Sequence, residues 1–380
     1  MYGSSLAIMR GEFPGLERSM LKFLCGVLLT LCTVVGPCAQ AASVLFLNPG
    51  TTKEAFWVSY SQFMQAAATD LNMDLRIQYS DRVAEITLKQ AREALQGPVR
   101  PDYLVFVNEQ YVAPEILRLS RGSGVKLFMV NNALTASQMS LLGSQPDKYP
   151  DWLGSLVPND EEGGYLMLKE LIRLHGPVAP GQFIDLLAFS GLKITPAAQL
   201  REKGMMRALA EHPEVRLRQL VYGGWTRQRA YEQAKLLFKR YPQASLVWSA
   251  NDEMAFGAMQ AYSETGGKPG KDALFGAINN SPAALQALLD NRLSVLLGGH
   301  FSLGGWALVQ LHDYDQGVDV SQYGGRDRQI PLLQLIDRAQ ARQLLAMDAA
   351  HNFGVDFHKL SAKGKPTTYR YPFSLQTLMH

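Results

Sequence analysis

The sequence predicts an α/β fold made of two doubly wound parallel-sheet lobes. Short, nearly continuous apolar runs of strand length alternate along the chain with longer amphipathic stretches. Continuous apolarity is typical of parallel strands that helices cover on both faces, whereas half-exposed strands alternate in polarity. The alternation forms two series, which meet at a cluster of breaker residues, 156–160. Strand–helix alternation in two series indicates two lobes, each with its own sheet.

The first series contains four predicted strands: Val44–Leu47, Leu75–Tyr79, Tyr103–Val107 and Lys126–Val130. The second contains five: Phe183–Ala188, Arg216–Val221, Leu246–Ser249, Leu274–Ile278 and Ser294–Leu297. Apolar side chains that recur every three or four residues predict the intervening helices. Helices are also predicted over 163–174 and 305–314, and a strand over Ile330–Ile336. Tyr369–Phe373 is a candidate edge strand in a tail that follows Ile336.

The first 41 residues have the pattern of a secretory signal. A positive start at Met20–Lys22 precedes the apolar run 23–36 and the small-residue site Ala39-Gln40-Ala41. The run is shorter than the roughly 20 residues of a spanning helix; the alternative is a buried N-terminal helix. We expect cleavage near Ala41 and export to the periplasm, with residues 1–19 reflecting a misassigned start.

All three cysteines lie in this segment, so the mature chain from Ala42 is expected to contain none. A disulfide framework, a thiolate nucleophile and a cysteine metal site are then excluded. The formal charge of +3 falls to about +2 without the first 41 residues and indicates neither nucleic acid nor an anionic membrane as a partner. The composition, 47% hydrophobic, is sufficient for one or two cores, and a monomer is expected.

The loops that follow the predicted strands are rich in amides and aromatic side chains. Ligands of doubly wound sheets bind at these loops, beyond the carboxyl ends of the strands. Amides, carboxylates and flat aromatic faces suit a polyhydroxylated small molecule. Each residue alone also has a structural explanation: Asn251 or Asp252 is placed to cap a helix, and Trp57 could be a core residue.

Two segments resemble a known family. Residues 250–258, Ala-Asn-Asp-Glu-Met-Ala-Phe-Gly-Ala, and 275–282, Phe-Gly-Ala-Ile-Asn-Asn-Ser-Pro, closely resemble the type I periplasmic binding proteins, in particular the ribose-binding group. The resemblance extends over nearly the whole mature chain to about Ile336. It implies two α/β lobes joined by three hinge strands, with a ligand enclosed between them. The long tail is similar to that of larger members, including autoinducer-2 receptors.

The resemblance implies lobe boundaries and a set of binding residues. The N-terminal lobe is expected to comprise 42–157 and 302–328, and the C-terminal lobe with the tail 158–301 and 329–380. Phe56 and Trp57 match the aromatic pair that sandwiches a sugar ring in the family. The full set of implied ligand-binding residues is Glu54, Phe56, Trp57, Asn131, Arg201, Trp225, Asn251, Asn279 and His300.

Two of these positions depart from the family pattern. Sugar binders of the family generally have carboxylates where this chain has Asn131 and Asn279. Carboxylates accept charge-assisted hydrogen bonds from vicinal hydroxyls, whereas amides both donate and accept. The ligand is therefore expected to be a sugar or a sugar-like molecule that carries its own acceptors or a negative charge. Arg201, with no carboxylate at those two positions, would meet such a group directly.

No catalytic, metal or cofactor motif is evident. The chain lacks H-E-x-x-H, the nucleophile elbow, and dinucleotide or P-loop glycine spacing. The favoured function is a non-catalytic binding protein that closes on its ligand and delivers it to an ABC importer. The alternatives are a receptor subunit for a membrane sensor kinase and, in a different class, an exported α/β hydrolase. The hydrolase would need a carboxylate pair at catalytic spacing.

Overall fold

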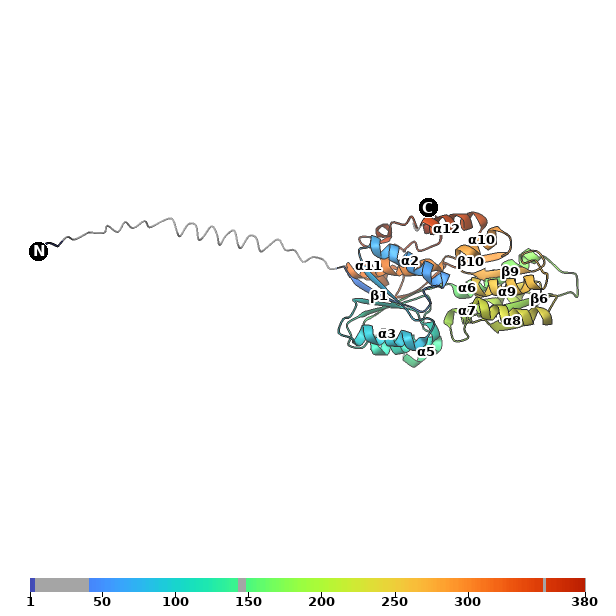
Figure 1. Cartoon of the computed structure of the whole chain (residues 1–380), viewed down its shortest axis with the longest axis horizontal. Helices are drawn as coiled ribbons and strands as arrows, with labels where there is room; N and C mark the ends of the chain where they lie inside the picture. The colour runs from blue at the N-terminus through green and yellow to red at the C-terminus, as the bar shows by residue number, and fades with distance from the viewer. Residues whose placement is uncertain (4–40, 143–147, 351–352, 380) are drawn as a thin grey trace. The chain divides into compact units, whose positions relative to one another are not determined.

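Two six-stranded sheets organise the chain in the computed structural model, which describes residues 1–3, 41–142, 148–350 and 353–379. The predicted signal segment falls almost wholly outside the described residues. In Figure 1 the first lobe contains the blue-to-cyan part of the chain together with the orange helix Leu303–Asp315, labelled α11, and the second lobe contains most of the green-to-orange part. The two-lobed α/β prediction is confirmed. No helix among the described residues is long and apolar enough to cross a membrane.

The first sheet has the strand order β11-β5-β4-β3-β1-β2, with every pair parallel. Helices follow its strands in the order that the alternation predicts. The bounds are β1 Ser43–Asn48, α2 Ala55–Asp70, β2 Asp74–Tyr79, α3 Ala84–Gln96, β3 Tyr103–Phe106, α4 Ala113–Leu119, β4 Lys126–Val130, α5 Ala136–Leu142, β5 Trp152–Pro158, α11 Leu303–Asp315 and β11 Asp327–Ile330.

The second sheet repeats this order as β12-β10-β9-β8-β6-β7 and is parallel except for the antiparallel edge strand β12. The bounds are α6 Asp160–His175, β6 Ile184–Ser190, α7 Pro196–Glu211, β7 Val215–Tyr222, α8 Arg227–Arg240, β8 Leu246–Ser249, α9 Asp252–Glu264, β9 Leu274–Ile278, α10 Pro282–Leu289, β10 Val295–Gly298, β12 Gln334–Leu335 and α12 Arg338–Ala350.

Alternate residues of β1 show why its uninterrupted apolar run suits a central parallel strand. Val44 and Phe46 are buried in one apolar cluster, and Leu45 and Leu47 in another. The two clusters lie on opposite faces of the sheet because successive strand side chains point in opposite directions. Both faces are therefore dry. The same switch in strand order occurs beside β1 and beside β6, and ligands bind at such points.

The chain crosses between the sheets in three places: after β5, between β10 and α11, and between β11 and β12. The prediction of a single strand over Ile330–Ile336 is wrong, because this segment contributes to both sheets. Pro331 separates the two short strands; it has no N–H to donate to a ladder. The three crossings together form the hinge region.

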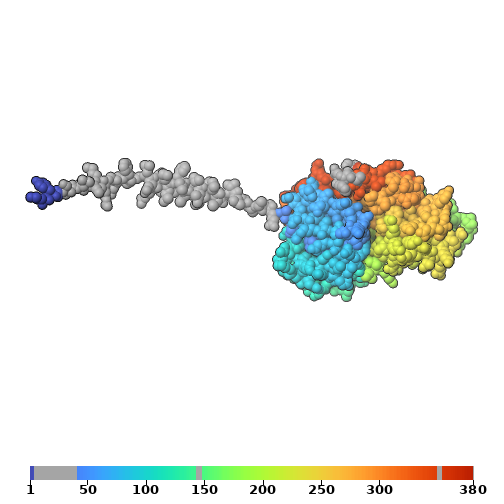
Figure 2. All heavy atoms as spheres, viewed as in Figure 1, coloured from blue at the N-terminus to red at the C-terminus, as the bar shows by residue number. Residues whose placement is uncertain are grey.

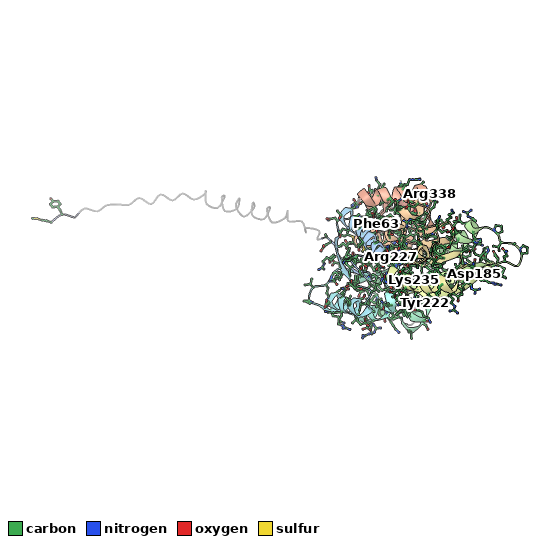
Figure 3. All side chains as sticks on the ribbon, turned by 45° about the vertical axis from the view of Figure 1, so that its right-hand side comes forward. Phe63, Asp185, Tyr222, Arg227, Lys235 and Arg338 are labelled. Carbon is green, nitrogen blue, oxygen red and sulfur yellow. The ribbon has the colours of Figure 1, made fainter. Side chains whose placement is uncertain are left out.

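The tail differs from its prediction. Residues 353–373 pack on α2 and α11 of the first lobe, although 329–380 was assigned to the C-terminal lobe. The Phe63 ring, labelled in Figure 3, makes edge contacts with Phe353 and Phe357, and Phe373 stacks on Trp306. The remaining lobe boundaries stay a prediction.

Tyr369–Phe373 forms no strand, because its rings stack on one another: the centroids of Tyr371 and Phe373 are 4.9 Å apart. Figure 2 shows the red atoms of the tail against both the blue first lobe and the orange part of the second.

Asp313, a fully buried carboxylate of α11, fixes the tail. It accepts hydrogen bonds from Ser361 Oγ, from the Ala362 N–H at 2.6 Å and from Tyr371 Oη at 2.7 Å. Burial raises the pKa of Asp313, but the neighbouring His312 ring and these hydrogen bonds favour the ionised form and hold the pKa below its ordinary value. An internal charge held by three donors therefore ties the tail to the first lobe.

We expect Tyr371→Phe to lower the free energy of unfolding by about 1.5–3 kcal/mol at pH 7, because it removes a hydrogen bond to a charged group. Since the folded-state pKa of Asp313 is depressed, this stabilisation is present above the unfolded value of about 4 and is lost as pH falls through the folded value. Urea unfolding from pH 7 to pH 3.5 measures both effects.

Tyr369→Phe is the matched control, because its hydroxyl donates to the neutral Leu360 carbonyl. Its effect should be about 0.5–1.5 kcal/mol and independent of pH in this range. Identical pH profiles for the two variants would contradict the role given to the Asp313 charge.

Candidate functional site

All nine sequence-predicted site residues line one cavity of about 30 Å³ between the two lobes. They come from loops at the carboxyl ends of strands in both sheets, from α2 and α7, and from the second hinge crossing. The structure adds five further residues to the lining. The complete lining is Glu54, Phe56, Trp57, Arg82, Glu109, Asn131, Asn132, Thr195, Ala197, Arg201, Trp225, Asn251, Asn279 and His300.

The aromatic wall of the first lobe depends on the turn between β1 and α2. Asn48 Oδ1 accepts a hydrogen bond from the Gly50 N–H at 2.9 Å and so fixes this turn. A Cβ at Gly50 would lie 2.1 Å from the Trp57 ring, so only glycine allows the indole to lie against the backbone. Phe56 meets Trp57 edge-on, with centroids 4.9 Å apart, and stacks on His300 at 4.5 Å.

The aromatic residue of the second lobe is held in an equivalent way. A Cβ at Gly191, which follows β6, would lie 2.1 Å from the Trp225 ring. Trp225 has a φ of 68°, which is unusual for a bulky residue. Asn251 Nδ2 donates to the Trp225 carbonyl at 3.0 Å, and its Oδ1 caps α9 by accepting from the Met254 N–H at 2.9 Å. Asn251 thus positions both Trp225 and the start of α9.

Arg201 has a carboxylate partner that the sequence did not reveal. Its Nε donates to Asp160 Oδ1 at 2.7 Å, and both side chains are almost completely buried. Its Nη1 donates to the Ala250 carbonyl at 2.6 Å. Burial raises the pKa of Asp160, and Arg201 opposes this shift. Arg201 therefore has a carboxylate partner within the protein although Asn131 and Asn279 are neutral.

His300 is a neutral donor in this site. Burial, reinforced by the Arg201 charge, lowers its pKa well below the ordinary value. Its Nε2 lies 3.3 Å from Arg201 Nη2. Because arginine can only donate, Nε2 accepts and the ring proton is assigned to Nδ1. This Nδ1 is buried without a partner among the described residues, so it is free to donate to a ligand.

A chain of charged groups runs along the first lobe and ends on the second. Arg82 forms ion pairs with Glu54 and, at 3.2 Å, with Glu109. Glu109 Oε2 accepts from Asn132 Nδ2 at 3.1 Å, and its Oε1 accepts from Thr195 Oγ1 of the second lobe at 3.0 Å. Burial raises the pKa of Glu109, an effect that Arg82 and these donors oppose. The lobes are therefore joined by a hydrogen bond to a buried carboxylate.

Five lining residues were not predicted from the sequence: Arg82, Glu109, Asn132, Thr195 and Ala197. A signal was present for the first two, because Arg82 follows β2 and Glu109 follows β3 at the carboxyl edge of the sheet. Their loops contain left-handed residues, with φ of 58° at Arg82. The pairing of these charges depends on distances across the sheet and has no local pattern.

Asn131 and Asn279 hold equivalent places after β4 and β9, and both have positive φ, 66° and 111°. Asparagine tolerates such conformations better than most residues. Asn279 Nδ2 donates to Asp252 Oδ1 at 2.8 Å, and Ser281 Oγ donates to the other oxygen. Burial raises the pKa of Asp252 to about 6, against these hydrogen bonds. The Asn279 amide thus donates to the Asp252 carboxylate, which gives a structural reason for an amide rather than a carboxylate at position 279.

Five buried polar atoms on the cavity wall have no partner among the described residues. The donors are Trp57 Nε1, Trp225 Nε1 and His300 Nδ1, and the acceptors are Asn131 Oδ1 and Asn132 Oδ1. Such atoms are costly unless a ligand or water satisfies them. The described residues contain no group of three or more side chains suited to a metal ion. The arrangement suits a small molecule with several hydroxyl groups.

These features define a two-lobed binding protein, and comparison with known proteins identifies its family. Residues 44–317 match the family described as periplasmic binding protein domain, and the chain belongs to this family. The resemblance noted in the sequence is therefore confirmed. The members are solute-binding proteins of the periplasm.

One solved relative is described as a periplasmic sugar-binding protein from Pseudomonas fluorescens. It is 62% identical, covers 89% of this chain and 100% of its own, and superposes with a TM-score of 0.83. A galactofuranose-binding protein, 18% identical with a TM-score of 0.69, covers 82% of this chain and 99% of its own and shares the fold.

Among curated relatives, the Galactofuranose-binding protein YtfQ of Escherichia coli (strain K12) is 30% identical over 117 residues, which is 30% of this chain. That match spans only 37% of the relative's length. A D-apiose import binding protein of Actinobacillus succinogenes is 23% identical over 64% of this chain and 76% of its own.

We expect Arg201→Ala to lower the free energy of unfolding by about 3–5 kcal/mol, because it leaves the Asp160 carboxylate buried and unpaired. The control is Arg227→Ala. Arg227, labelled in Figure 3, pairs with Glu253 at 3.1 Å but is about half exposed, at 48%. That variant should lose less than about 1 kcal/mol. Equal losses in urea unfolding would contradict the role of burial.

We expect Asn279→Asp to destabilise the fold strongly at pH 8 and much less at pH 5. A second carboxylate would face Asp252, and a proton shared between the two at low pH relieves their repulsion. Unfolding in urea at both pH values measures the difference. Asn131→Asp is the control, because no carboxylate bonds to Asn131; a pH dependence as large as that of Asn279→Asp would argue against this pairing.

Proposed function

We propose that this chain is a periplasmic binding protein that encloses a neutral sugar between its lobes and presents it to an ABC importer. The observation that carries the proposal is the interlobe cavity whose wall combines tryptophan and phenylalanine with unpartnered donors and acceptors. Sugar hydroxyls satisfy both kinds of polar atom, and sugar C–H faces pack on aromatic rings. The description of the 62% identical relative as sugar-binding supports the same ligand class.

The charges of the cavity favour a neutral ligand over an anionic one. Arg82 is paired with Glu54 and Glu109, and Arg201 is paired with Asp160. Each cationic group therefore has a carboxylate partner within the protein. An anionic ligand would have to displace one of these partners, and the proposal accordingly departs from the acceptor-rich or charged ligand that the sequence favoured.

Closure of the lobes is the proposed mechanical step. Besides the bond from Thr195 to Glu109, Gln199 Nε2 donates across the cleft to Tyr111 Oη at 2.6 Å. The cavity of about 30 Å³ has room for little more than a water molecule, so the lobes must separate to admit a sugar. A ligand that touches both lobes then favours the closed state by contacts available only there. No catalytic step is part of this proposal.

A membrane sensor kinase could recognise the same closed state, so binding alone does not separate import from sensing. The matched family and the import function printed for a relative favour the importer. Pull-down of the sugar-loaded chain with a permease–ATPase complex in nanodiscs, against a sensor ectodomain, separates the two.

The test is a titration with L-arabinose, D-galactose and D-apiose by calorimetry and tryptophan fluorescence. A bound sugar should change the tryptophan fluorescence, because two of the five tryptophans line the cavity. It should also reduce the radius of gyration in solution scattering, because the lobes close on it. Trp57→Phe and Trp225→Phe should weaken binding at least tenfold, about 1.4 kcal/mol, through lost stacking and a lost donor.

Trp152→Phe is the control, since Trp152 lies in β5 and donates to the Gly154 carbonyl. It should leave the affinity unchanged. Absence of binding by every neutral sugar would sink the proposed ligand class, and binding without a change in the radius of gyration would sink the closure step.

A further inference from the structure

A second cavity, of about 360 Å³, lies directly beside the first. The loop after β4, the first hinge crossing and the first turns of α7 form its wall. Both lobes therefore contribute to it, as they do to the sugar cavity. Its lining is Asn131, Asn132, Ala133, Leu134, Thr135, Ala136, Val157, Pro158, Asp160, Pro196, Gln199, Leu200 and Lys203.

The two cavities share a wall. Asn131 and Asn132 line both of them, and the Oδ1 atom of each is buried without a partner among the described residues. The ion pair between Arg201 and Asp160 also lies between the two cavities, because Arg201 lines the first cavity and Asp160 lines the second. A ligand that occupies both cavities would therefore lie against Asn131 and Asn132.

The second cavity is mainly apolar, in contrast to the first. Leucine, valine, proline and alanine side chains supply most of its wall. Apart from the two amide oxygens on the shared wall, three of its polar groups bind other protein groups: Gln199 donates to Tyr111, Lys203 pairs with Glu161, and Asp160 pairs with Arg201. An occupant of this cavity therefore gains by burying apolar surface rather than by hydrogen bonding.

We propose that the site takes a glycoside, with the sugar in the first cavity and an apolar aglycone in the second. The inference rests on the proposed sugar-binding function and specifies its ligand class. An apolar cavity of about 150 Å³ is sufficient for benzene, so the second cavity has room for an aryl group or a short alkyl chain. The shared amide oxygens accept hydrogen bonds from sugar hydroxyls next to the glycosidic bond.

The test compares methyl and phenyl glycosides of L-arabinofuranose and D-galactofuranose, with the free sugars alongside, by calorimetry on the whole mature chain. The methyl glycoside blocks the anomeric hydroxyl without filling the second cavity. The phenyl glycoside should bind at least tenfold more tightly than the methyl glycoside of the same sugar. Equal or weaker binding of the phenyl glycoside, with the free sugars bound, overturns this inference alone. Failure of all the probes to bind overturns the proposed function as well.

Variants that fill the second cavity test whether the phenyl group binds there. Leu200→Trp enlarges a side chain that is 36% exposed on the cavity wall, and it should bring the affinity ratio of phenyl to methyl glycoside close to one. Leu236→Trp, on α8 at a position 72% exposed, is the matched control and should keep the tenfold ratio. The same ratio in both variants would show that the phenyl group binds elsewhere.

Ala136→Phe, on the loop side of the cavity, provides a second filling variant should Leu200→Trp melt at a lower temperature than the wild type. It too should bring the ratio close to one, and retention of the tenfold ratio would overturn the assignment of the aglycone to this cavity.

Discussion

The buried ion pair between Arg201 and Asp160 is the constraint on which the site depends. Two charges removed from water are tolerated only when their remaining hydrogen bonds are also satisfied. Here the guanidinium reaches Asp160 at the start of α6, the Ala250 carbonyl after β8, and His300 at the second hinge crossing. The hydrogen bonds of the Arg201 guanidinium thus fix α6, α7, the loop before α9 and the hinge relative to one another.

Each lobe holds a tryptophan ring against its backbone next to a glycine. A glycine after the first strand of each sheet lets an indole lie against the backbone: Gly50 under Trp57 and Gly191 under Trp225. Each ring is therefore fixed by its own lobe, so the proposed closure of the lobes would bring the two indoles together without rearranging either one.

The sequence predicts what depends on local pattern. Apolar runs located nine of the strands, and family motifs located nine cavity residues, because strand ends and N-caps have local signals. Pairings across the fold have none: Asp160 lies 41 residues from Arg201, and nothing local links Glu109 to Thr195. The packing of residues 353–373 has no local signal either, since it depends on Asp313 and a cluster of rings on α2 and α11.

The tail also bears on how the lobes can move. Phe373 stacks on Trp306 of the first lobe, whereas Gln376 bonds to Gln334 of β12 at 2.7 Å. The chain therefore returns to the second lobe within three residues. Rotation of one lobe against the other must bend the backbone there or break one of these contacts. Since stacked, buried rings are harder to separate than an exposed amide pair, the polar contact on β12 is the one that yields first.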